Sequence, residues 1–289
     1  MSWIILTLIT IIIWSIVNIF DKHIVDKEIR NPYVDTIVFS FAQFVFLLAF
    51  GIYGLRDFSP TYFYLAIVAG IVYFVATYFY YSAMKKEQVS TLAPILGVEP
   101  AIVALLAFLF LSESLSFFHY LAILIIIVGA WLISYEKNKK LAHVHWLSFL
   151  AMVAFAGRNV LIKAGADLAL PFGAICLGLG LGGLMALFVA VLLAVPHFDK
   201  HSGHSIRKLL FVSALSAIGF VFYAKAISIG SVSLVSALLS VKPVVVFALS
   251  LLLSRFNPKF LHEKMDRKQL LTKIAAIVLI IIGGVMLVW

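Results

Sequence analysis

Residues 90–111 read STLAPILGVEPAIVALLAFLFL, and residues 232–253 read VSLVSALLSVKPVVVFALSLLL. Each stretch has the length of a membrane span, and each carries an ionisable residue followed by proline: Glu99-Pro100 in the first and Lys242-Pro243 in the second. A charge is costly in hydrocarbon, and a proline interrupts helical hydrogen bonding. Interrupted helices at matching places in two halves of a chain indicate the central binding site of a transporter.

The composition of the whole chain agrees with a membrane protein. Of its 289 residues, 64% are hydrophobic and 12% are charged, whereas a soluble domain carries about a quarter charged residues. A helix needs roughly 20 apolar residues to span the hydrocarbon layer, and the chain holds about ten such stretches. We therefore predict an all-α polytopic membrane protein. The expected spans are residues 2–20, 34–54, 61–83, 90–111, 117–135, 146–166, 170–195, 209–229, 232–253 and 270–289.

The two halves of the chain repeat each other in sequence. The aligned pairs are Asn18 with Asn159, Tyr80 with Tyr223, Pro100 with Pro243, and Gly129 with Gly284. These pairs occur in the same order and predict two five-helix units, residues 1–140 and 141–289. Because five is an odd number of crossings, the second unit is expected to lie in the membrane inverted relative to the first.

Four blocks of sequence resemble the EamA-type members of the drug/metabolite transporter superfamily. They are residues 14–22 (WSIVNIFDK), 90–96 (STLAPIL), 109–116 (LFLSESLS) and 129–133 (GAWLI). The resemblance covers nearly the whole chain and implies an inverted-repeat carrier that works by alternating access, in a bacterial plasma (inner) membrane. Small multidrug relatives use a first-span Glu for proton and cation binding. Here that span offers only Asp21, near its expected end, which argues against a drug-cation antiporter.

The distribution of basic residues predicts the orientation. Seventeen of the 22 Lys and Arg residues lie in or beside the connections that follow odd-numbered spans. Positively charged connections tend to stay in the cytoplasm, so we expect both termini outside. The remaining basic residues are Arg56 and Lys163 in even-numbered connections, and Arg158, Lys225 and Lys242 inside spans.

Glu99 and Lys242 are the first candidate site residues. The expected spans place every acid except Glu99 in loops or near span ends. Two interpretations of Glu99 stay open. It either couples transport to protons or contacts the substrate, or it forms an ion pair with Lys242 that joins the two halves. Pro100 and Pro243 are the candidate hinges beside these charges.

Arg158 and Lys225 add two more cations at membrane depth, giving three cations against one acid. A charge at this depth is expected to face a cavity or a partner, and the guanidinium fork suits planar oxyanions. This surplus favours an anionic or zwitterionic cargo. The alternatives are that Lys225 extends to the nearer interface and that helix-end carbonyls satisfy Arg158.

Polar and aromatic residues complete the candidate substrate site: Asn18, Asn159, Trp14, Gln43 and Tyr80. Trp14 lies one helical turn from Asn18 on the same helix face. For the amides, the alternative is hydrogen bonding between helices. For Tyr80 and Trp14, the alternative is packing.

These features favour a secondary transporter of a small metabolite, either amino acid-like or an organic anion, in a lipid bilayer. The chain carries no nucleotide-binding motif, so proton coupling or exchange is expected to drive it. We expect no cofactor, no nucleic acid, no metal site in the histidine-containing loop 197–204, and a monomer or homodimer. The alternatives are a membrane-embedded enzyme acting on a lipid-linked substrate, for which no catalytic set is evident, and an accessory subunit.

Overall fold

The structure is a computed structural model that describes residues 2–27, 32–53, 60–86, 99–134, 145–193, 203–242, 244–246, 248–249, 252 and 267–286. Its described residues form ten helices and no strand. The helices are α1 (Trp3–Lys27), α2 (Pro32–Tyr53), α3 (Phe63–Lys86), α5 (Glu99–Leu111), α6 (Phe117–Ser134), α7 (His145–Asp167), α8 (Phe172–Leu193), α9 (Gly203–Ile229), α10 (Val232–Leu239) and α12 (Arg267–Met286).

Six of these helices, α1, α2, α3, α7, α8 and α9, are long and apolar enough to cross a membrane. The other apolar helices are shorter, and they include α5 and α10, which lie next to the two ionisable-proline pairs. The predicted all-α polytopic membrane fold is confirmed.

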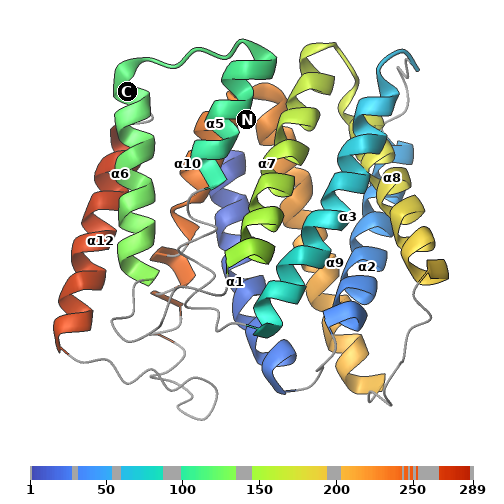
Figure 1. The fold of residues 1–289 in the computed structure, drawn as a ribbon, viewed down its shortest axis with the longest axis horizontal. Helices are drawn as coiled ribbons and strands as arrows, with labels where there is room; N and C mark the ends of the chain where they lie inside the picture. Colours follow the sequence, from blue (N-terminus) through green and yellow to red (C-terminus); the bar gives the residue numbers. More distant parts are fainter. Residues whose placement is uncertain are drawn as a thin grey trace.

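The helices form one bundle with a smaller group at its side (Figure 1). Helix α7 contacts α3, α5 and α9, while α8 packs on α2 and α3, and α1 packs on α9. Helices α6 and α12 pair with each other at the edge of the molecule. Helices α1 and α7, which open the two halves of the chain, run in opposite directions (Figure 1), as an inverted repeat requires.

Glycines on α8 allow it to lie directly against its neighbours. A Cβ atom added to Gly182 would meet the backbone carbonyl of Ile67 on α3, and one added to Gly183 would meet the Phe44 ring on α2. Gly178, one turn away, faces Ala66 on α3 in the same manner. Close backbone approach through small residues is the usual means of packing membrane helices.

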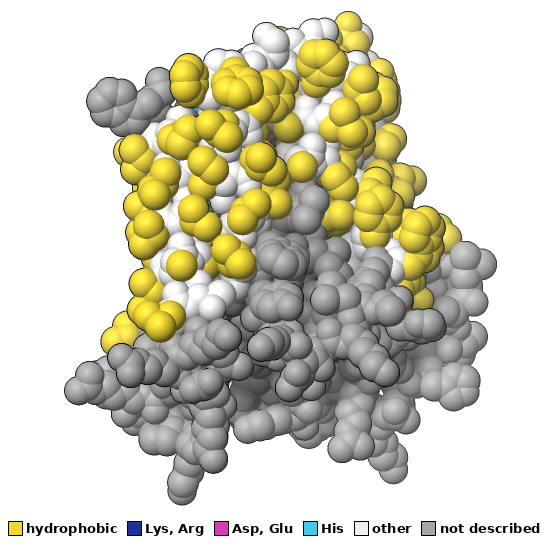
Figure 2. Space-filling view, turned by 60° about the vertical axis from the view of Figure 1, so that its left-hand side comes forward, with side chains coloured by type: hydrophobic (Ala, Val, Ile, Leu, Met, Phe, Trp, Pro, Cys, Tyr) yellow, Lys and Arg dark blue, Asp and Glu magenta, His cyan; other side chains and the backbone are white. Residues whose placement is uncertain are grey.

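The outer surface is apolar, as a lipid-facing surface must be. Figure 2 shows a face on which the described side chains are predominantly hydrophobic. Phe108, Phe110 and Phe117 are among the most exposed of the large apolar side chains. Soluble proteins rarely expose an apolar surface that covers a whole face, so this surface is suited to contact with lipid.

Both ionisable residues belong to short apolar helical segments, Glu99–Leu111 and Val232–Val246. The described part of α5 starts with Glu99 and Pro100. Helix α10 ends at Leu239, and the N–H groups of Ser240 and Val241 bond to carbonyls three residues earlier. Lys242 follows this turn. Pro243 lies outside the described residues.

Helix α1 is longer than the membrane span that it contains. Its apolar span runs from Trp3 to Asp21, close to the expected residues 2–20, and the helix continues to Lys27. The helix therefore contains Asp21, whose side chain is 5% exposed. Asp35, near the start of α2, is fully buried as well. Glu99 is thus not the only acid among the packed helices.

Candidate functional site

Arg158 lies at the middle of α7 with 4% of its surface exposed. Its guanidinium carbon is 4.5 Å from the centroid of the Tyr73 ring, 5.0 Å from that of Phe155 and 5.1 Å from that of Phe220. Rings at these distances attract the cation through their quadrupoles. Aromatic residues of α3, α7 and α9 therefore hold this charge in the centre of the bundle.

Asn159 joins Arg158 to the first half of the chain. The Arg158 Nε and Nη2 atoms donate to Asn159 Oδ1 at 3.0 Å and 2.7 Å. Asn159 Nδ2 in turn donates to Glu99 Oε1 at 3.0 Å and to the Tyr223 hydroxyl at 3.0 Å. One buried amide thus bridges a cation and an anion that come from different repeats.

Tyr223 carries this connection on to α10. The Tyr223 hydroxyl accepts from Asn159 and also shares a hydrogen bond of 3.3 Å with Ser236 Oγ, in which either hydroxyl can donate. Ser236 lies on the short helix that precedes Lys242. We call Glu99, Arg158, Asn159, Tyr223 and Ser236 the central network. It links α5, α7, α9 and α10.

Lys242 lies beside the central network and makes no hydrogen bond or ion pair within the described part of the chain. Its Nζ atom is 5.9 Å from the centroid of the Trp14 ring. Glu99, its expected ion-pair partner, bonds to Asn159 in this structure. Lys242 is nevertheless within electrostatic reach of both Glu99 and Asp21.

The central network leaves donors for a ligand. A guanidinium group has five N–H donors, and the two that bond to Asn159 are the only ones of Arg158 with a hydrogen-bond partner among the described residues. The ammonium of Lys242 is close by. This arrangement suits an oxyanion such as a carboxylate, because guanidinium binds planar oxyanions through paired donors.

The other predicted site residues lie at different distances from this centre. Trp14 contacts the Tyr223 ring, with centroids 5.2 Å apart, and its Nε1 donates to the Ser216 carbonyl at 3.1 Å. Asn18 is half-buried and has no hydrogen-bond partner in the described residues. Gln43 is fully buried, and neither of its polar side-chain atoms has a described partner.

Tyr80 and Lys225 are outside the central network. The Tyr80 ring packs against the rings of Tyr81 and Phe155, at centroid distances of 5.5 Å and 6.2 Å. The Lys225 Nζ atom lies 4.9 Å from the centroid of Phe172, at the start of α8. The histidine-containing loop 197–204 has no described side chain.

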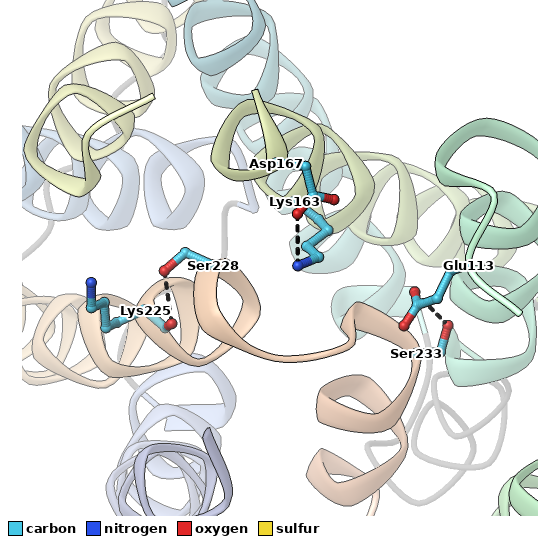
Figure 3. A network of polar contacts seen from close by, with 6 residues as sticks. All are labelled: Glu113, Lys163, Asp167, Lys225, Ser228 and Ser233. Atoms are coloured by element: carbon cyan, nitrogen blue, oxygen red, sulfur yellow. Dashed lines mark hydrogen bonds and ion pairs between the residues drawn. The ribbon is translucent and has the colours of Figure 1, made fainter. Parts of the chain in front are cut away.

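Figure 3 shows the polar contacts at one end of the bundle. Ser233 on α10 donates to Glu113 Oε2 at 3.2 Å, a bond that joins the two halves. Lys163 pairs with Asp167 within α7 at 2.9 Å, and the Ser228 hydroxyl donates to the Lys225 carbonyl at 2.9 Å. Of these three contacts, only the Ser233–Glu113 bond joins two different elements.

Sequence reasoning missed several residues around Arg158. Tyr223 had a signal, because it aligns with the candidate Tyr80, and Phe155 aligns with Trp14 in the same way. Tyr73 had a weak signal, because the third span is rich in aromatic residues that can cover a cation. Phe220 and Ser236 had none, because aromatic and hydroxyl residues are common throughout these helices. Asp21 was correctly placed at the end of the first apolar span, but its burial depends on how the helices pack and could not be predicted.

The bundle of long apolar helices defines a polytopic membrane protein. The sequence profile of the EamA-like transporter family matches residues 1–135 and again residues 144–289. The chain belongs to the EamA-like transporter family, within the drug/metabolite transporter superfamily, which is not an enzyme family.

A comparison with solved structures supports the fold but says nothing about function. One solved structure, titled "Crystal structure of protein", is similar with a TM-score of 0.71 and 19% sequence identity, over 98% of this chain and 95% of the other. No curated protein matches the sequence significantly.

Proposed function

We propose that this chain is a secondary-active carrier of small metabolites that bear a carboxylate, with amino acid-like zwitterions preferred over organic anions. The observation that supports this proposal is the pairing of Arg158 with Glu99 through Asn159. The site offers donors for a carboxylate and, a short distance away, an acid for an ammonium group.

The buried charges favour a zwitterion over a pure anion. The expected surplus of cations counted Glu99 as the only acid, but Asp21 and Asp35 are also buried. The charges of Asp35 and Lys242 act on Asp21, and those of Arg158 and Lys242 act on Glu99. A nearly balanced region binds a cargo without net charge at a lower electrostatic cost than a cargo with one.

Alternating access would move the two repeats, 1–140 and 141–289, about this site. The central network connects Glu99 at the start of α5 to Ser236 on α10, and both helices lie next to an ionisable-proline pair. Such helix ends near the membrane midplane are suited to binding and to hinge motion. Release of the Asn159–Glu99 bond would let the halves separate on one side.

We further propose a bacterial plasma (inner) membrane with both termini outside, on the strength of the basic connections after odd-numbered spans. A reporter fused after Trp289 tests this orientation. Activity of a reporter that works only outside the cytoplasm is expected, and activity of one that works only in the cytoplasm would contradict it.

Transport by the purified chain in sealed liposomes tests the function. Uptake of labelled alanine, glutamate and succinate is compared for the wild type, Arg158→Gln, and the control Lys163→Gln, which removes a charge at a helix end. We expect alanine uptake at the highest rate, loss of uptake in Arg158→Gln and retention in the control. Equal uptake by wild type and Arg158→Gln would contradict the proposal.

A further inference from the structure

Asp21 is a buried carboxylate that lies outside the central network. Its side chain is 5% exposed, and its Oδ1 atom is buried without a hydrogen-bond partner in the part of the chain that the structure describes. A carboxylate in that position is costly when ionised. The cost is removed when a proton, a cation or water occupies the free oxygen.

Asp21 has apolar side chains on one side and titratable or charged side chains on the others. Val17 and Ile24, one turn to either side on α1, pack with Leu209 and Val212 on α9. The titratable and charged groups near it are Asp35 on α2, Tyr80 and Tyr81 on α3, and Lys242 beyond α10. On α9, which packs along α1, Arg207 is exposed and Lys208 is half-buried in the first turns.

Asp21 belongs to a polar face that leads away from the substrate site. Trp14, Asn18 and Asp21 follow each other at spacings of four and three residues, so they share one face of α1. Trp14 contacts Tyr223 of the central network. At 1.5 Å per residue, Asp21 lies about 10 Å further along the helix.

Buried polar groups on α2 extend the same pattern. Ser40 and Gln43 are almost completely buried, and their side-chain polar atoms have no partner among the described residues. Phe44, next to Gln43, packs against Tyr73, which lies under the Arg158 guanidinium. Unpartnered polar atoms in a packed core usually bond to water or to a ligand.

We infer that Asp21 is a proton-binding site of this carrier, separate from the substrate site at Arg158 and linked to it through Lys242. This inference rests on the proposed function for its role in transport. The proton enters from water, adds to the free Asp21 oxygen and neutralises the carboxylate; it leaves to water in the opposite-facing state.

Lys242 is the means of communication between the two sites. It is within electrostatic reach of Glu99 and of Asp21. When Asp21 takes up a proton, it no longer attracts the Lys242 ammonium. Glu99 is then the one anion of this pair that still attracts it. Proton occupancy therefore changes the charge balance at the acid that bonds to Asn159.

Infrared difference spectroscopy of the purified full chain tests the proton site without a substrate. Spectra are compared between about pH 5 and about pH 8, the range in which a physiological proton switch operates. We expect Asp21→Asn to lose one protonated-carboxyl component that the wild type and Asp167→Asn retain. Asp167 is a suitable control because it is an exposed acid paired with Lys163 at a helix end. An unchanged spectrum in Asp21→Asn would overturn the inference.

A conservative variant covers the case in which Asp21→Asn does not fold. Asp21→Glu keeps the carboxyl group, so it is expected to retain the component with a displaced titration midpoint. A titration identical to that of the wild type would also overturn the inference.

A flux measurement tests the role in coupling. With a pH gradient across the liposomes, we expect wild-type accumulation of labelled alanine to fall by about tenfold or more in Asp21→Asn, the equivalent of about 1.4 kcal/mol. Exchange of alanine at equal pH is expected to continue, because Asp21 does not bind the substrate. Full gradient-driven accumulation in Asp21→Asn would overturn the coupling role. Failure of the wild type to move any tested compound would instead contradict the proposed function, and the infrared test would still decide the proton site.

Discussion

The two repeats place the same residue types in unequal surroundings. Asn159 in the second half bonds to Arg158, Glu99 and Tyr223. Its counterpart Asn18 in the first half has no hydrogen bond among the described residues, and Tyr80, the counterpart of Tyr223, makes ring contacts instead. The position that matches Arg158 is Val17, a packing residue on α1.

This difference indicates that the repeats have specialised. The second repeat supplies the cations and the amide that we assign to the substrate, and the first supplies Glu99 and the buried acid Asp21. A sequence alignment of the halves identifies the shared positions. We assign the chemical role in each pair to the position with the polar partners.

The largest effect is expected from Arg158, which has no charged counterpart in the first repeat. Arg158→Ala removes the donors for a carboxylate and leaves Glu99 and Asn159 without their cation. Losing one partner of a buried charged pair costs about 2–5 kcal/mol, so uptake should fall by about two orders of magnitude. Arg158→Lys restores the charge without the fork and should recover only part of the uptake, as measured by initial rates in liposomes.

The two asparagines give the most direct comparison of the repeats. Asn159→Leu breaks the bridge between Arg158 and Glu99, and hydrogen bonds to charged groups contribute about 1.5–3 kcal/mol, so substrate affinity should fall by about tenfold or more. Asn18→Leu is the matched control and should lower affinity by less than about threefold. Competition binding measures both. Equal losses would show that the repeats contribute alike and would contradict their specialisation.

A smaller difference is expected for the paired tyrosines. Tyr223→Phe removes one acceptor and one donor from the central network but keeps the ring, and a neutral hydrogen bond contributes about 0.5–1.5 kcal/mol. Transport should fall by about threefold to tenfold, whereas Tyr80→Phe should leave it close to the wild type. Parallel flux assays with expression-matched variants compare the two. A stronger effect of Tyr80→Phe would reverse the assignment.

The smallest effect is expected from Lys225, although its position deep inside a predicted membrane span made it a candidate contact for the cargo. Its ammonium lies over Phe172 and outside the central network. Lys225→Met should change uptake of alanine and succinate by less than about threefold, because neither the Arg158 donors nor Glu99 is altered. A selective loss of succinate uptake would place Lys225 in the anion site after all.

The sequence predicts the fold class and part of the site for clear physical reasons. Long apolar stretches define the spans, and the cost of burying charges singles out Glu99, Arg158 and Lys242. The repeat adds Asn159. These predictions depend on composition and spacing, which a single sequence contains.

The cage around Arg158 could not be predicted, because it depends on which helices are neighbours. Tyr73 and Phe220 come from α3 and α9, and nothing in their local sequence distinguishes them from lipid-facing aromatics such as Phe108. The burial of Asp21 could not be predicted for a related reason: it lies at the end of an apolar span, and the apolar pattern alone does not show that α1 continues as a packed helix to Lys27.

The central claim is that Arg158, Asn159 and Glu99 recognise a carboxylate and an ammonium on one small molecule. Competition against labelled alanine by unlabelled alanine, alaninamide and propionate, in the wild type and in Arg158→Gln, measures both groups at once. We predict that alanine competes best in the wild type, that each analogue lacking one group competes less well, and that Arg158→Gln no longer distinguishes alanine from alaninamide. Competition by alaninamide equal to that by alanine in the wild type would contradict the account.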